Sequence, residues 1–381
     1  MRVLVYSAFY LPGYKGGGPI KTIANLIATT SNEITYDIVT RDRDLGDKTP
    51  YTEVKPNCWT TLDGVSIFYT TPNFQGLAYA WIQTLQSDYD VVYLNSFFSP
   101  FFSFIPLLLA KIRKKKVILG PRGEFSSGAL SLKKHKKRVF IRVFKSLLLD
   151  RGTIFQASTE REAREIRKAM GAKVDIFVAE DIGLYPEEMS LTPKSADLLK
   201  LVFVSRISPM KNLSYALEVL KGLSCNVSFD IFGPIEDQEH WAQCVKIIDS
   251  LPTNVTVSYR GELYPREVLK ALSRYDLFFL PTRGENYGHV IAEALSAGVP
   301  VLIADTTPWR NLKDQGIGWD LPLNRMELFS EAIEEAAAMS ADTYSAFRHK
   351  VMNWAKDKFS QTDAIEANKR MFRYALKRSE I

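Results

Sequence analysis

Two glutamates eight positions apart, Glu285 and Glu293, have the residue type and spacing to bind a polyhydroxylated ligand. They lie in PTRGENYGHVIAEALSAGVPVLIAD, where a strand-like run ends at Thr282 and a helical pattern begins near Tyr287. The N–H groups at a helix start are unpaired and the helix dipole adds positive charge, so a diphosphate could bind there. Glu293, two turns into the helix, could accept hydrogen bonds from vicinal hydroxyls such as those of a ribose. The predicted binding residues of this stretch are Asn286, Tyr287, Gly288, His289 and Glu293.

A second motif, VSRISPMKN, carries Arg206 and Lys211 directly after another apolar run. Two fixed cations beside a helix start could neutralise a diphosphate as it leaves a reacting sugar, without help from a metal ion. The three cysteines are widely scattered and only four histidines are present, so a zinc site has few candidate ligands. We therefore expect reduced thiols, no protein-bound metal and no cofactor.

The first half of the chain contributes further candidates in loops that follow strand-like runs. Gly16, Gly17 and Gly18 precede a helical pattern without forming GxGxxG, and glycines let the backbone approach a ligand closely. Glu124 could orient a hydroxyl of a second substrate that accepts the sugar, which we call the acceptor. It could instead be an ion-pair partner of Arg122 or of a neighbouring lysine. The residues that we assign to the acceptor side are Asn95, Arg122, Glu124 and Glu160.

Strand-like runs alternate with helical patterns throughout, which predicts βαβ units in parallel sheets. The pattern restarts after Asp181, and 381 residues exceed the size at which a single core stops growing. The predicted fold class is α/β with two doubly wound domains, at 1–182 and 183–358, joined by a linker within 181–199. A helical tail at 359–381 is expected to cross back onto the first domain. Open sheets of this kind bind ligands at the carboxyl ends of their strands.

The composition, with 46% hydrophobic residues, excludes a disordered chain. The longest apolar segment, 97–110, falls short of the roughly 20 residues that a membrane-spanning helix needs. The N-terminus lacks the charged start and uninterrupted apolar run of a signal peptide. We therefore expect a cytoplasmic protein.

Basic charge is concentrated in the first half of the chain. The first 190 residues carry 26 Lys and Arg against 19 Asp and Glu, whereas the remainder carry 23 against 24. Between Lys111 and Lys145, thirteen basic residues accompany the single acid Glu124. We expect residues 111–145 to form a basic surface that contacts an anionic membrane from its inner, cytoplasmic side.

A helix expected over 133–145 joins a cationic cluster to an apolar stripe, which favours contact with a membrane surface. The stripe consists of Phe140, Val143, Phe144 and Leu147. The alternative is an ordinary amphipathic helix whose apolar side packs on the first domain. Nucleic-acid binding is disfavoured, because Phe140 and Phe144 share one side of the helix instead of forming a stacking platform.

The paired glutamates, followed by Ala294 and the strand entry Gly298-Val299-Pro300-Val301, resemble the donor-site signature of family 4 retaining glycosyltransferases. Arg206 and Lys211 resemble the phosphate-binding pair of that family. The stretches TTPWRNL and GWDLPL resemble members from bacterial surface-polysaccharide pathways. The chain departs from the family at 92–96, where many members carry a histidine and this sequence reads VYLNS. No residue is therefore assigned as a catalytic base.

The resemblance implies the GT-B fold, in which an acceptor-binding and a donor-binding Rossmann-like domain face each other across a cleft. It implies retaining transfer of a hexose-type sugar from a nucleoside diphosphate, UDP in preference to GDP, to a glycan or lipid-linked glycan in surface-polysaccharide (O-antigen, capsule or lipopolysaccharide) synthesis. Glu285 would hold the donor sugar and Glu293 the ribose, and Arg206 and Lys211 would stabilise the leaving diphosphate. The three glycines at 16–18 would contact the donor.

Two alternatives remain open at this stage. One is a sugar-nucleotide epimerase or a phosphorylase on the same fold, since fold alone does not determine function. The other is a non-catalytic carbohydrate- or membrane-binding relative. The sequence leaves the nucleotide base, the sugar, the acceptor and the oligomeric state open.

Overall fold

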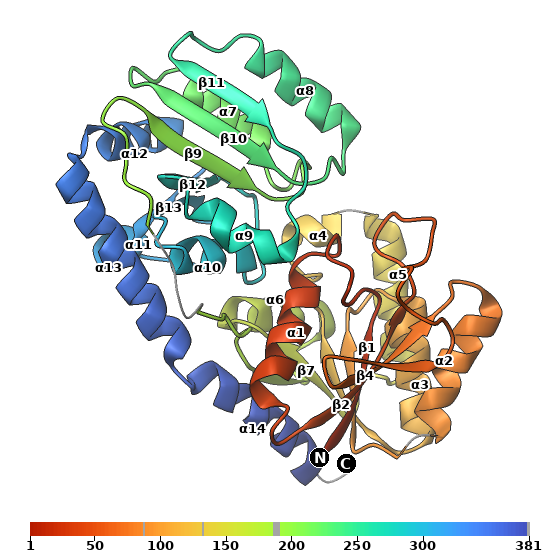
Figure 1. Ribbon diagram of the computed structural model, residues 1–381. Helices are drawn as coiled ribbons and strands as arrows, with labels where there is room; N and C mark the ends of the chain where they lie inside the picture. Colours follow the sequence, from red (N-terminus) through yellow and green to blue (C-terminus); the bar gives the residue numbers. More distant parts are fainter. Residues whose placement is uncertain (87, 132, 186–190, 379–381) are drawn as a thin grey trace. The chain divides into compact units, whose positions relative to one another are not determined.

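A computed structural model describes residues 1–86, 88–131, 133–185 and 191–378 (Figure 1). The chain divides into two compact units, one formed by Met1–Ile182 with Thr362–Ile381 and the other by Gly183–Gln361. We expected the tail to begin at 359, but helix α13 (Ala341–Ser360) continues through that position. Residues 186–190 of the predicted linker lie outside the described residues.

The first unit is built on an eight-stranded sheet in the order β3-β4-β2-β1-β5-β6-β7-β8. Neighbouring strands are parallel except β3 and β4, which form an antiparallel hairpin. Strands such as β1 and β5 are buried on both faces, as is usual where helices cover a parallel sheet. The strands are β1 (Arg2–Ser7), β2 (Thr35–Arg41), β3 (Trp59–Leu62), β4 (Val65–Thr70), β5 (Val91–Asn95), β6 (Lys116–Gly120), β7 (Thr153–Ala157) and β8 (Asp175–Val178).

Helices cover both faces of this first sheet. Residues of α1 (Gly18–Thr30) and of the C-terminal helix α14 (Asp363–Lys377) share one core. Lys369 of α14 forms an ion pair with Glu33 at 2.7 Å, so the tail packs within the first unit. The other core takes in residues of α2 (Phe74–Gln86), η1 (Pro100–Phe104), α3 (Ile105–Ile112), α5 (Lys134–Ser146) and α6 (Glu160–Met170), and a short helix α4 (Ser127–Ser131) precedes α5.

The second unit is built on a fully parallel six-stranded sheet in the order β11-β10-β9-β12-β13-β14. The strands are β9 (Leu199–Val204), β10 (Val227–Phe232), β11 (Val255–Tyr259), β12 (Leu277–Leu280), β13 (Val301–Ala304) and β14 (Gly318–Leu321). The helices before α13 are α7 (Leu213–Leu220), α8 (Gln238–Ile248), α9 (Pro265–Leu272), α10 (His289–Ser296), α11 (Leu312–Gln315) and α12 (Met326–Ala338).

Both sheets reverse their strand order beside the first strand of the unit. The reversal lies between β1 and β5 in the first sheet and between β9 and β12 in the second. This is the doubly wound topology predicted from the sequence, and such a switch point is the usual place for a ligand. The loops after these four strands contain most of the predicted site residues.

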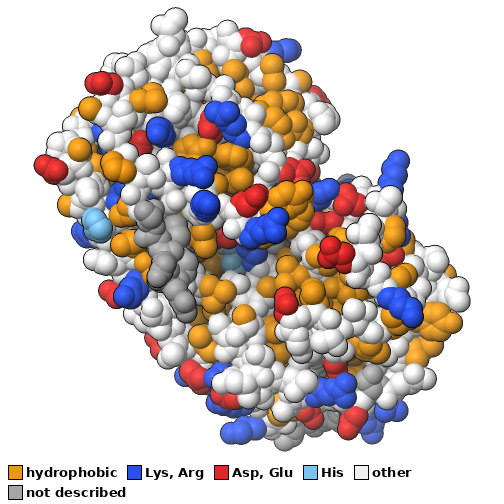
Figure 2. Space-filling model, viewed as in Figure 1, with side chains coloured by type: hydrophobic (Ala, Val, Ile, Leu, Met, Phe, Trp, Pro, Cys, Tyr) orange, Lys and Arg blue, Asp and Glu red, His pale blue; other side chains and the backbone are white. Residues whose placement is uncertain are grey.

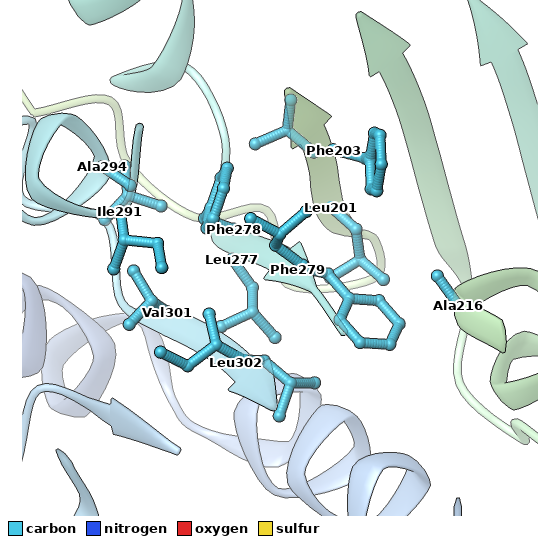
Figure 3. Close-up of a cluster of buried hydrophobic side chains, with 14 of the residues drawn as sticks. Leu201, Phe203, Ala216, Leu277, Phe278, Phe279, Ile291, Ala294, Val301 and Leu302 are labelled. Atoms are coloured by element: carbon cyan, nitrogen blue, oxygen red, sulfur yellow. The ribbon is translucent and has the colours of Figure 1, made fainter. Parts of the chain in front are cut away.

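Helices also cover both faces of the second sheet. Figure 3 shows Phe278 of β12 directed toward Ile291 and Ala294 of α10, while Phe279 is directed toward Ala216 of α7. This alternation follows from the two-residue period of a strand, which sends successive side chains to opposite faces. Residues of β9, β12, α7 and α10 thus pack together in one hydrophobic core.

The basic segment 111–145 is not one continuous surface. Strand β6 runs through the middle of this segment, and its residues Val117–Gly120 are buried. The prediction of one basic surface over 111–145 is therefore wrong for these residues. The predicted apolar stripe of α5 is also divided, because Phe144 is buried and the Phe140 ring lies 5.5 Å from that of Phe97. The outward apolar stripe consists of Val139, Val143 and Leu147, which are 57%, 42% and 52% exposed. Among the described residues, no helix has the length and apolar character needed to cross a membrane.

Candidate functional site

The loops after β9 and β12, on either side of the second switch point, are hydrogen-bonded to each other. The Arg283 N–H donates to the Met210 carbonyl at 2.8 Å, and the Thr282 hydroxyl donates to the same oxygen at 3.1 Å. The Asn212 amide donates to the Pro281 carbonyl at 3.0 Å. The two stretches that the sequence singled out therefore form one connected surface at the carboxyl edge of the sheet.

Lys211 and Glu285 form an ion pair across these two loops. Their side chains are only 13% and 12% exposed, so the charges interact in partly desolvated surroundings where attraction is stronger than in water. Both residues were predicted from the sequence, but their direct pairing was not. An anion that binds beside Lys211 would compete with Glu285 for its ammonium group.

Arg206 pairs with a glutamate that the sequence analysis did not name, and its predicted contact with a diphosphate stays a prediction. Its guanidinium donates to Glu236 at 2.7 Å, in the loop after β10, and both side chains are about 40% exposed. Exposed pairs of this kind contribute little to stability, so the guanidinium can exchange partners at small cost. Sequence reasoning missed Glu236, although its position four residues after β10 is a strand-end signal.

The start of α10 is closely packed around Gly288. This glycine has a φ of +85°, and a Cβ there would lie 2.9 Å from Ile291 Cδ1 and 3.3 Å from Trp309 Nε1. The Trp309 indole donates to the Tyr287 carbonyl, and the two rings lie 5.5 Å apart. Tyr287 and His289 are buried, whereas the predicted Asn286 and Glu293 are half-buried. Trp309, a missed residue, thus holds the helix start in place.

The glycine-rich loop of the first unit is anchored by Asp44. One carboxylate oxygen accepts the N–H groups of Tyr14 and Lys15 at 2.7 and 2.9 Å. Gly17, with a φ of +70°, is the N-cap of α1, and Gly18 is the first residue of that helix. A Cβ on Gly16 would lie 3.0 Å from atoms of Phe9 and Ile20. Asp44 was not predicted, and the role of the three glycines stays a prediction.

Arg122 and Asn95, two residues predicted for the acceptor side, lie together in the first unit. The guanidinium donates to Asn95 Oδ1 at 2.7 Å and to Asp181 Oδ1 at 2.9 Å. Asp181 also accepts the Thr22 hydroxyl at 3.0 Å, and the Arg122 side chain is only 6% exposed. The charge of Arg122 is therefore balanced inside the unit by Asp181, which the sequence had placed only in a linker.

Glu124 closes the loop after β5. It accepts the Ser96 hydroxyl at 2.8 Å and the N–H groups of Phe97 and Phe98 at 2.5 and 3.1 Å. Burial raises the pKa of the Glu124 carboxyl, and these hydrogen bonds oppose the rise because they favour the charged form. The sequence analysis gave an ion pair between Glu124 and Arg122 as one alternative. That alternative is wrong, because Arg122 pairs with Asp181.

Glu162, which the sequence analysis missed, connects the loops after β6 and β7. Its two oxygens accept the N–H groups of Gly123 at 2.6 Å and Ser158 at 2.7 Å. Burial raises its carboxyl pKa as well. The predicted neighbour Glu160 is exposed at the first position of α6. A glutamate two residues farther into the helix therefore makes the buried contacts, and an acceptor-side role for Glu160 stays a prediction.

We expect Glu124→Ala to lower the free energy of unfolding by about 1–3 kcal/mol, because the amides of Phe97 and Phe98 lose their acceptor. Urea unfolding of the two proteins measures this difference. Glu160→Ala is the matched control, and loss of an exposed glutamate should change stability by no more than about 0.5 kcal/mol. Equal effects of the two substitutions would contradict the role of Glu124 in closing this loop.

Residues 186–354 match the protein family described as glycosyl transferases group 1. The second unit is a glycosyl transferases group 1 domain. This match confirms the family resemblance of the motifs around Arg206 and Glu285. The glycosyl transferase domain thus contains the connected surface formed by the loops after β9 and β12.

The chain is also similar to an uncharacterized 41.2 kDa protein in the cps region of Klebsiella pneumoniae. The two are 23% identical over 299 residues, which cover 75% of this chain and 79% of that protein. Among solved structures, sucrose-phosphate synthase from Thermosynechococcus elongatus has a TM-score of 0.73 at 13% identity and covers 98% of both chains. Anabaena HepE, solved in complex with UDP and glucose, has a TM-score of 0.70 at 16% identity and covers 98% of this chain and 99% of that one. These likenesses show the GT-B fold.

Neither metal ligands nor disulfides are apparent in the described part of the chain. Within it, no three His, Cys, Asp or Glu side chains are grouped so that they could hold a metal ion. Cys58, Cys225 and Cys244 are free thiols, and burial raises the pKa of the Cys244 thiol to about 12. The charged groups that the structure places at the candidate site are Arg206, Lys211 and their carboxylate partners.

Proposed function

We propose that this chain is a retaining, metal-independent glycosyltransferase that moves a hexose-type sugar from a nucleoside diphosphate to a hydroxyl of a glycan or lipid-linked glycan. The observation that carries the proposal is the Lys211–Glu285 pair at the switch point of a glycosyl transferases group 1 domain. The similarity to a protein in a cps region supports a place in surface-polysaccharide synthesis. The similarity to HepE, solved with UDP and glucose, supports UDP as the nucleotide.

Each charged residue of this surface has a role in the proposed reaction. The diphosphate lies against the start of α10, where the helix dipole attracts an anion. Lys211 and Arg206 exchange their carboxylate partners for phosphate oxygens, and their charges stabilise the diphosphate as it leaves. Glu285, released from Lys211, accepts hydrogen bonds from the donor sugar. Glu293 accepts those of the ribose.

The configuration at the anomeric carbon is retained most simply if the acceptor attacks the same face of the sugar that the diphosphate leaves. A double displacement would need a carboxylate nucleophile, as in retaining glycosidases, and no residue is assigned that task here. In the proposed step, the acceptor oxygen bonds to the anomeric carbon as the bond to the phosphate oxygen breaks. That phosphate oxygen accepts the proton of the acceptor hydroxyl.

The proposal is tested by the thermal stabilisation that nucleotides give to the full chain. We expect UDP and UDP-sugars to raise the unfolding temperature more than GDP or ADP, because stabilisation grows with ligand concentration over dissociation constant. EDTA and added Mg²⁺ should change neither the shift nor the transfer rate. Glu293→Ala should abolish the shift, while Glu331→Ala, which removes an exposed glutamate of α12, should keep it.

Loss of nucleotide binding in EDTA would refute the metal-independent mechanism. Conversion of the UDP-sugar to an isomer without an acceptor would favour an epimerase instead. Nucleotide binding without any transfer to added glycans would favour a non-catalytic relative.

We also propose that the first unit contacts an anionic membrane through α5. Its exposed stripe Val139, Val143 and Leu147 lies on the same helix as the exposed cations Lys136 and Arg142. Such an amphipathic surface binds by inserting apolar side chains while each nearby cation adds about 1 kcal/mol of attraction. Hydrophobic side chains, drawn orange in Figure 2, and Lys and Arg, drawn blue, also reach the surface elsewhere on the molecule, so a test of α5 needs an exposed apolar control on another helix.

We expect the double substitution Val139→Gln with Val143→Gln to lower partitioning onto anionic vesicles by about tenfold. The reason is that binding then removes less apolar side-chain surface from water. Co-sedimentation at low and moderate salt, with neutral vesicles in parallel, measures the effect. Val245→Gln, at an exposed valine of α8 in the other unit, is the control and should have no effect. Vesicle binding that depends neither on lipid charge nor on the two α5 substitutions would leave the membrane contact without support.

A further inference from the structure

Arg41 is the last residue of β2 and lies at the carboxyl edge of the first sheet. Its guanidinium carbon lies 5.1 Å from the centre of the Phe9 ring and 5.5 Å from that of the Phe102 ring. Phe9 follows β1, and Phe102 belongs to η1, which follows β5. The guanidinium is therefore held between the segments that continue from the two strands of the switch point, where open sheets bind ligands.

The charge of Arg41 has no carboxylate partner in the part of the chain that the structure describes. Within that part, its guanidinium takes part in the two ring contacts and in no hydrogen bond or ion pair. The side chain is half-buried, and burial lowers the pKa of the guanidinium, as does the nearby charge of Arg43. Charges that are removed from water are normally paired, so this one is suited to bind an anion.

The acids that follow Arg41 in the sequence are engaged by other groups. Asp42 accepts hydrogen bonds from Arg43 Nε at 2.8 Å and from its Nη2 at 3.2 Å. Asp44 accepts three backbone N–H groups. Neither carboxylate is therefore available to Arg41, although both are close in the sequence.

A single guanidinium fits a carboxylate better than a phosphate. A phosphate monoester carries a charge of roughly −2 at neutral pH, and the cation that could balance the second charge, Arg43, is paired with Asp42. A carboxylate carries one charge, and its two oxygens match the fork of N–H donors of an arginine. In sugars, a carboxylate distinguishes uronic acids from neutral hexoses.

We propose that Arg41 binds a carboxylate of the acceptor, so that the acceptor is an acidic glycan with a uronic acid near the reacting hydroxyl. Two N–H groups of the guanidinium donate to the two carboxylate oxygens, while Phe9 and Phe102 keep the guanidinium in place. The inference rests on the proposed function and names the class of its acceptor. A neutral sugar would leave the half-buried charge without a partner.

Methyl glucuronoside and methyl glucoside are matched probes, because they differ only in a carboxylate in place of a hydroxymethyl group. Saturation-transfer NMR titrations with the full chain measure their dissociation constants. We expect the glucuronoside to bind at least tenfold tighter than the glucoside, the usual effect of a charged bidentate pair. The galacturonoside and galactoside, measured in parallel, repeat the comparison with a second ring configuration. Glucose 6-phosphate should bind more weakly than the better of the two uronosides.

Three variants separate a built site from general attraction to a basic protein. Arg41→Met removes the charge and keeps an apolar stem between the rings, and we expect the uronoside to bind at least tenfold more weakly. Arg41→Lys keeps the charge without the fork, so its affinity should lie between those of the other two proteins. Arg164→Met, at an exposed arginine of α6 in the same unit, loses the same charge, and its affinity should remain within twofold.

Equal weakening by Arg41→Met and Arg164→Met would overturn the proposal. Uronosides that bind no tighter than their neutral counterparts would also overturn it, as would tighter binding of glucose 6-phosphate, because the anion would then be a phosphate. UDP should stabilise the Arg41→Met protein as much as the unchanged one, and a smaller stabilisation would mean that Arg41 contacts the donor instead. A failure of the proposed function is distinguishable, because UDP would then stabilise none of these proteins.

Discussion

Lys211→Met is expected to lower the turnover number for sugar transfer by about 10²–10³-fold, the usual loss when a preorganised group that stabilises developing charge is removed. Lys211 is 13% exposed and pairs with Glu285, so its charge acts in partly desolvated surroundings. Without it, the diphosphate would also meet the uncompensated carboxylate of Glu285, which repels it. We therefore expect weaker binding of the nucleotide as well as slower transfer.

The matched control for this prediction is Lys313→Met in the same unit. Lys313 also pairs with a glutamate, Glu335, but it is 69% exposed and belongs to α11, away from the switch point. Initial rates at saturating acceptor, with the unfolding temperature of each variant measured in parallel, compare the two changes. Lys211→Met with kcat/KM within threefold of the unchanged protein would refute the donor-site assignment.

Arg348→Met is expected to destabilise the second unit by about 3–5 kcal/mol, because it leaves buried carbonyls without a donor. The guanidinium donates to the carbonyls of Gly298, Thr192 and Ser273 at 2.8, 2.8 and 3.0 Å. Ser273 is the C-cap of α9, and the Ala297 carbonyl at the end of α10 also accepts from Arg348. A cation at two helix C-termini is favourable both as a donor and in the field of the dipoles.

Urea unfolding followed by tryptophan fluorescence measures this loss, since four of the six tryptophans lie in the second unit. Arg373→Met is the control, because Arg373 is 52% exposed and its pairs on α14 should contribute no more than about 1 kcal/mol. Arg348→Lys should be intermediate, because a lysine keeps the charge but lacks the fork of donors. A midpoint unchanged by Arg348→Met would contradict the proposed capping of α9 and α10.

The elements of the fold were predictable because their signals are local. The helical pattern expected beside the three glycines is α1, which begins at Gly18 with Gly17 as its cap. Two domains followed from the restart of the pattern after Asp181. The paired glutamates and the Arg206–Lys211 spacing were visible for the same reason, since each motif lies within one strand-loop-helix segment.

The surroundings of the candidate residues were not predictable in this way. Arg122 and Asp181 are 59 positions apart, and their contact depends on where the chain returns after β8. Phe144 and its neighbour Val143 are both apolar, so only packing decided that Phe144 is buried and Val143 exposed. Asp44, Glu236 and Trp309 were missed because single polar or aromatic residues in loops carry no periodic signal. Glu162 was missed because its place in the first turn of α6 does not reveal which loops it contacts.

The sequence by itself determined the order of strands and helices and the residue types placed where strands end, because hydrophobic period and helix signals act over a few neighbouring positions. The tertiary structure alone decided the partners of those residues. Lys211 meets Glu285 across 74 positions because β9 and β12 are neighbours in the sheet, and that adjacency also holds their loops together. A charge in a loop acquires its partner only when the sheet order brings another strand end beside it.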